Sequence, residues 1–170
     1  MVVPTTPPPY PYEVLEDVED PQDYEPGGFH PVSIHDTFRD GRYRVVHKLG
    51  FGGYSTVWLA KDEQSNHYVA IKVGAADAPA SEHENRIVTR LLSSTDPGRQ
   101  YIRPLLDHIT ITGPNGRHSC LVTTPARLSL RDAKEDYSWP SLAPVGFRVI
   151  AAQLVEAVAY MHGQGVVHGG

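Results

Sequence analysis

Residues 49–60, LGFGGYSTVWLA, place three glycines within four positions between two apolar runs. Glycine in a strand region loses backbone entropy and offers no side chain to pack, so folding alone does not account for this loop. Backbone N–H groups that carry no side chains can lie close over an anionic oligophosphate. The stretch therefore predicts a phosphate-binding loop.

A lysine on the following strand fits the same chemistry. Lys72 ends the run VAIK and would face the apolar side of its strand, where an unpaired ammonium would lose its proton. Glu84 is the candidate counter-charge, because at 100° per residue it lies close to Val88 on the apolar face of the next helix. The pair would leave donors of Lys72 free for phosphate oxygens. Alternatively, Glu84 caps its own helix as the last residue of a Ser81-x-x-Glu84 capping box.

The elements around the loop distinguish three kinds of nucleotide site. A dinucleotide fingerprint passes from a strand into a helix, and a Walker loop ends in Gly-Lys-Ser or Gly-Lys-Thr before a helix. Here the loop joins two predicted strands, and the lysine follows on a third. This order argues against a dehydrogenase-like nucleotide binder.

The periodicity of the chain predicts an α+β fold with three strands, a helix, two strands and a final helix. The predicted strands are Tyr43–Leu49, Thr56–Lys61, His67–Val73, 101–112 and 118–123, the last two joined by a turn at Gly113–Gly116. The first helix opens at Ser81, a short helix starts at Leu128–Arg131, and an amphipathic helix covers Phe147–Met161 and ends at Gly163.

Composition predicts the character of the N-terminal segment and excludes several classes of protein. Residues 1–28 are rich in Pro, Tyr and acid and contain no Lys or Arg, so we expect a disordered tail; its Pro7–Tyr10 matches a Pro-Pro-x-Tyr ligand of WW-type domains. The net charge of −5 argues against a DNA-binding protein. The N-terminus lacks the features of a secretory signal, and the apolar stretch Val149–Met161 is too short to cross a bilayer. These features predict an intracellular protein, in the cytoplasm or the nucleus, with no membrane partner. The single Cys120 is expected to be buried.

Taken together, these motifs resemble those of the protein kinase family. Leu49–Val57 looks like the kinase Gly-rich loop with Ser55 at the third glycine, and VAIK looks like the motif of the phosphate-anchoring lysine. Glu84 corresponds to the acid of helix C. The lead-in Tyr24–Val32, followed by Gly41–Val45, is similar to that of SR-protein kinases of the fungal type, which are serine/threonine kinases acting on Arg-Ser repeats of splicing factors.

The resemblance implies a kinase N-lobe, a five-stranded antiparallel sheet plus helix C, over residues 29–126, and the first helices of the C-lobe over 127–170. It also implies ATP as the nucleotide, with Thr123 as gatekeeper and Arg-Ser-rich splicing factors as partners. The implied ATP-binding residues are Leu49, Gly50, Phe51, Gly52, Gly53, Tyr54, Ser55, Thr56, Val57, Ala70, Lys72, Glu84, Thr124 and Ala126.

The sequence departs from the family at its last residues. The catalytic loop of the family reads His-x-Asp, whereas here Gly170 follows His168 and Gly169 in the place of the catalytic Asp. The catalytic residues and the Mg²⁺ ligands are thus missing from this chain, and without them phosphoryl transfer is not expected. The final helix would keep an uncovered apolar face, which predicts a truncated gene product. The alternative is a non-catalytic kinase fragment acting as an interaction or regulatory protein.

Overall fold

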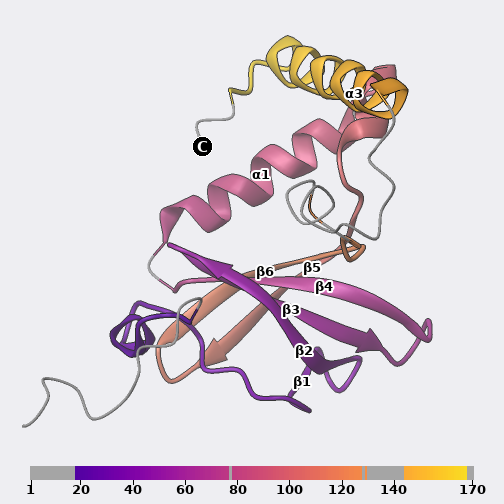
Figure 1. The fold of residues 1–170 in the computed structure, drawn as a ribbon. Coiled ribbons are helices and arrows are strands. Elements are labelled where there is room, and N and C mark those ends of the chain that lie inside the picture. Colours follow the sequence, from indigo (N-terminus) through magenta and orange to yellow (C-terminus); the bar gives the residue numbers. More distant parts are fainter. Residues whose placement is uncertain (1–17, 77, 128, 130–143, 168–170) are drawn as a thin grey trace, which may run out of the picture.

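The computed structural model describes residues 18–76, 78–127, 129 and 144–167 (Figure 1). The Pro7–Tyr10 motif and the residues His168–Gly170 lie outside the described residues, as does most of the short helix expected at Leu128–Arg131. Figure 1 shows α1 lying over one side of a curled sheet, with α3 beyond it.

The sheet is antiparallel and has six strands in the order β1-β2-β3-β4-β6-β5. This confirms the α+β class and corrects the strand count from five to six. The additional strand, β1, has only two residues, which is too short to show the period-two alternation by which strands are recognised. The strands are β1 Thr37–Phe38, β2 Tyr43–Gly52, β3 Ser55–Asp62, β4 His67–Gly74, β5 Leu105–Gly113 and β6 Gly116–Thr123.

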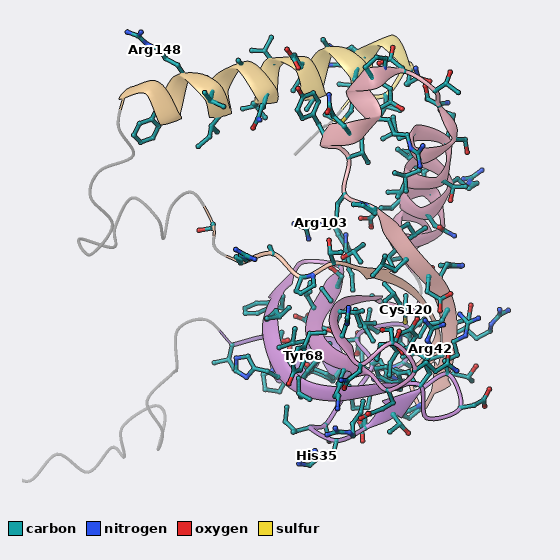
Figure 2. The ribbon with its side chains drawn as sticks, turned by 90° about the vertical axis from the view of Figure 1, so that its right-hand side faces the viewer. His35, Arg42, Tyr68, Arg103, Cys120 and Arg148 are labelled. Carbon is teal, nitrogen blue, oxygen red and sulfur yellow. The ribbon has the colours of Figure 1, made fainter. Side chains whose placement is uncertain are left out.

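Alternation along the strands divides the sheet into two faces. On β3 every second residue is buried, beginning with Thr56, and Trp58 and Ala60 belong to the main core. Cys120, labelled among the strands in Figure 2, is fully buried in the core, as predicted, and burial raises the pKa of its thiol to about 12. The core comprises Phe38, Tyr43, Val45, Trp58, Ala60, Val69, Ile71, Val73, Ile109, Cys120 and Val122.

The helices are the 15-residue α1 Pro79–Ser93, the 20-residue α3 Pro144–Gly163 and the 3-10 turns η1 Pro21–Tyr24 and η2 Pro97–Tyr101. The capping-box prediction for α1 is wrong. The helix begins with a proline at its first position and has Ala78 as N-cap with no side-chain hydrogen bond. Strand β5 begins at Leu105 and not at residue 101, because η2 ends at Tyr101 and residues 102–104, which include Pro104, are not part of a strand.

The N-terminal segment differs from the expected tail over 18–28. Its η1 turn is capped by Asp20, which accepts from the backbone N–H of Gln22. The Nδ2 atom of Asn115, in the β5–β6 turn, donates to the carbonyls of Tyr24 and Phe29 at 3.0 and 2.6 Å. These long-range contacts order residues whose composition alone predicts disorder.

Helix α3 contacts the rest of the described chain chiefly through its C-terminal end. There Tyr160 joins Leu91 and Val166 in a second buried cluster. Earlier on the helix, large apolar side chains are exposed, at Phe147, Val149, Leu154 and Val155, which agrees with the predicted uncovered face. Among the described residues, no helix is long and apolar enough to cross a bilayer.

The end of β3 holds a buried carboxylate whose ionisation should control acid stability. Asp62 accepts from Arg42 Nε at 3.1 Å and Nη2 at 2.9 Å, and from the backbone of Gln64 and Ser65. The Arg42 guanidinium lowers the pKa of Asp62 well below its ordinary value of 3.8. The stabilisation is therefore fully present above that value and is lost as the pH falls toward the folded-state pKa.

We expect Asp62→Asn to lower the urea midpoint at neutral pH and to flatten the loss of stability between about pH 4 and pH 2. Asp40→Asn, an exposed loop acid, serves as the control and should keep the wild-type slope. Parallel acid profiles for Asp62→Asn and the wild type would contradict this assignment.

Candidate functional site

Strands β2 and β3 form the predicted glycine hairpin. The register pairs Gly52 with Ser55, so Gly53 and Tyr54 form a two-residue tip. A Cβ atom added at Gly50, Gly52 or Gly53 would meet no atom within 4 Å. A larger residue would therefore fit at Gly52 and Gly53 without touching the rest of the chain. The backbone at these two positions faces open space. Gly50 has a φ of +157°, which residues with a side chain rarely adopt.

Lys72 lies in a row across three neighbouring strands. The register places Val57 of β3, Lys72 of β4 and Leu121 of β6 side by side. Ala70, two residues earlier on β4, shares this face because side chains alternate along a strand, and its β6 partner is Thr123. The row therefore lies opposite the core face, on the side covered by α1.

Glu84 of α1 reaches Lys72, as the helical spacing predicted. The Nζ atom of Lys72 donates to Oε1 and to Oε2 of Glu84, each at 2.7 Å. Both side chains are 39% exposed, so solvent screens the attraction and the pair contributes little to stability. Its effect is positional, because it holds the Lys72 side chain extended toward α1, beside the hollow that the hairpin tip also lines.

Two adjoining hollows surround this ion pair. The larger, about 630 Å³, lies between the hairpin tip and α1, and the smaller, about 300 Å³, lies over Val57 and Ala70. Both are lined by Lys72 and Glu84. Their sizes and their mixture of apolar walls with a few polar groups are typical of small-molecule sites.

The structure brings together part of the predicted set. Those that line one or both hollows are Gly52, Gly53, Tyr54, Ser55, Val57, Ala70, Lys72 and Glu84, together with Thr123. Leu49, Gly50, Phe51, Thr124 and Ala126 line neither.

Thr56 lies on the opposite face from the hollows. Its side chain is fully buried, and its hydroxyl accepts from the indole N–H of Trp58 at 3.0 Å. Alternation along β3 explains this position, because Val57 faces the hollows and its neighbour must then face the core. The Thr56 side chain therefore belongs to the core.

Sequence reasoning missed much of the floor of the larger hollow. Ile102 follows η2, and Val166 follows α3. The sequence pattern had placed Ile102 in the predicted strand 101–112, and Val166 belongs to no periodic element, so no sequence signal places either residue at the hollow. The face of α1 that lines the hollow, Ile87, Val88 and Leu91, does follow the predicted helical spacing.

Within the described ranges, no group of three or more His, Cys, Asp or Glu side chains is placed to hold a metal ion.

A search of known proteins finds serine/threonine kinases that are similar to this chain. The chain is 39% identical over 159 residues to serine/threonine-protein kinase spk-1 of Caenorhabditis elegans, which covers 90% of this chain. It is 35% identical to serine/threonine-protein kinase SKY1 of Saccharomyces cerevisiae and 37% identical to SRSF protein kinase 3 of Homo sapiens, each over 86% of this chain. This chain is a homologue of the SR protein kinases.

The similarity covers only part of each relative. The matched region spans 16% of the worm kinase, 21% of the yeast kinase and 27% of the human kinase. A scan against protein-family models gives no match. The homology to SR protein kinases agrees with the subfamily that the lead-in Tyr24–Val32 and Gly41–Val45 predicted.

Proposed function

We propose that this chain is the ATP-binding lobe of an SR-type serine/threonine kinase. The observation that carries the proposal is the Lys72–Glu84 ion pair beneath a glycine hairpin, at the junction of two hollows. An ATP molecule would place its phosphates between the bare hairpin backbone and the Lys72 ammonium. Val57 and Ala70 would contact the adenine ring from the sheet side.

The chain's own residues would bind and orient the nucleotide. The N–H groups of Gly52 and Gly53 carry no side chains and can approach phosphate oxygens closely. Lys72, held by Glu84, supplies charge-assisted hydrogen bonds to the same oxygens. The family suggests phosphoryl transfer to serines of Arg-Ser-rich proteins, and we propose this activity for the whole protein. We also propose an intracellular location.

The alternative function, a non-catalytic kinase fragment that acts as an interaction or regulatory protein, stays a prediction.

Nuclear magnetic resonance with the isotope-labelled chain tests the proposed site directly. Titration with ATP should shift the backbone amide signals of Gly52, Gly53 and Lys72, while adenosine should shift signals near Ala70 but leave the glycine amides in place. The physical reason is that only ATP brings phosphates under the hairpin. Saturating ATP that moves no signal in the two hollows would overturn the proposal.

A further inference from the structure

A third hollow, on the other side of α1, has no role in the proposed nucleotide site. It measures about 360 Å³ and lies between α1 and the outward face of β5 and β6. Apart from Ala76, every residue that lines it is polar, namely Asn85, Arg86, His108, Thr110, Arg117 and Ser119. We call it the basic hollow.

The basic hollow gathers positive charge from two separate elements. Arg86 lies on α1 and Arg117 on β6. No carboxylate of the described residues lies within 4.0 Å of either guanidinium. By contrast, Arg44 on β2 pairs with Glu63 at 2.8 Å. The Nη2 atom of Arg86 lies 3.4 Å from Nδ1 of His83. The other N–H donors of Arg86 and those of Arg117 face no carboxylate of the described residues and are available to an anion.

Hydrogen-bonding groups complete the wall. The strand register sets Thr110 directly opposite Ser119, and the Oγ atom of Ser119 lies 2.9 Å from Nε2 of His108. The Oδ1 atom of Asn85 is buried without a hydrogen-bond partner.

We propose that the basic hollow binds a phosphoryl group carried on a phosphorylated serine or threonine of a peptide. A phosphoryl group has close to two negative charges at neutral pH and three acceptor oxygens, which match two guanidiniums and the hydroxyl donors. The volume lies at the lower end for ligand sites and suits one phosphorylated side chain. Arg86, His108, Thr110 and Arg117 are exposed, so a group attached to a polypeptide can reach them.

The basic hollow is distinct from the nucleotide site. Glu84 and Arg86 are two positions apart on α1 and therefore point about 200° apart around the helix axis. No residue lines both the basic hollow and either of the other two. A failure of one site in an experiment thus does not imply a failure of the other.

Fluorescence anisotropy with a labelled phosphoserine peptide tests the proposal on the full chain. We expect Arg117→Gln and Arg86→Gln each to weaken binding about tenfold or more, because each removes a charged hydrogen-bonding group. Arg148→Gln is the matched control and should bind as the wild type does. It removes the same charge from an exposed position at the far end of α3 (Figure 2). Lys72→Met should also keep peptide binding.

Binding measurements with other ligands show whether the basic hollow recognises a phosphopeptide, free phosphate or a nucleic acid. The unphosphorylated peptide should not bind, and excess inorganic phosphate should displace the phosphopeptide. Equal binding of both peptides, unchanged binding by Arg117→Gln and Arg86→Gln, or inorganic phosphate binding as tightly as the phosphopeptide would overturn the proposal. Tighter binding of a single-stranded RNA oligonucleotide, lost in Arg117→Gln, would overturn it in favour of a nucleic-acid site.

Discussion

Lys72→Met should weaken ATP binding by roughly one to two orders of magnitude, the effect of losing charge-assisted hydrogen bonds to the phosphates. The fold should survive, because the Lys72–Glu84 pair is partly exposed and contributes little to stability. Isothermal titration calorimetry gives the affinity, and thermal unfolding without nucleotide gives the stability. The two measurements separate a binding defect from a folding defect.

Lys61→Met is the matched control for this experiment. Lys61 lies on the neighbouring strand β3, forms a surface ion pair with Glu63 at 3.5 Å and lines neither nucleotide hollow. It removes the same charge, and we expect it to keep the wild-type affinity. Glu84→Gln should give an intermediate loss, because the ammonium remains but is no longer held. Equal affinities for Lys72→Met and the wild type would contradict the proposed role and favour a non-catalytic interaction protein.

Local pattern explains why the sheet could be predicted. Strands β3 and β4 contain continuous apolar runs bounded by polar or glycine residues, and they match the predicted runs to within one residue at each end. The hairpin between β5 and β6 follows from its Gly113–Gly116 turn. The start of α1 could not be read in the same way, because Ser81 and Glu84 imitate a capping box inside a helix that Pro79 begins.

Long-range contacts explain what the sequence does not show. The segment around η1 is ordered by Asn115, more than eighty positions further along the chain. The Lys72–Glu84 pair was predictable, because helical spacing and strand alternation both constrain it. The placement of Val166 under the nucleotide hollow was not, because it depends on how the end of α3 docks.

The docking of α3 rests largely on one aromatic side chain. Tyr160 is only 5% exposed, and its hydroxyl donates to the carbonyl of Leu91 on α1. A Cβ atom added at Gly98 of η2 would lie 2.5 Å from the Cβ of Tyr160, so the glycine is what lets the two elements approach. Tyr160 therefore joins α3 to both α1 and η2.

Tyr160→Ala should weaken this docking by about 3–5 kcal/mol, the usual cost of truncating a large buried aromatic side chain. Much of the rest of α3 is exposed, so we expect the helix to detach while the sheet stays folded. Amide hydrogen exchange should then show lost protection over α3 Pro144–Gly163 and unchanged protection in β3 and β4. Leu154→Ala, at a position 62% exposed on the same helix, should leave both unchanged.

The same variant links the docking of α3 to the nucleotide site. Three residues of the second buried cluster and its surroundings also line the larger hollow, namely Leu91, Met161 and Val166. If α3 detaches, Met161 and Val166 no longer line the larger hollow. ATP affinity should then fall, although the hairpin, Lys72 and Glu84 are unchanged. Tyr160→Phe keeps the ring and removes only one hydrogen bond, so it should cost about 1 kcal/mol of docking and leave ATP affinity close to that of the wild type. Full protection of α3 in Tyr160→Ala would show that other contacts hold the helix.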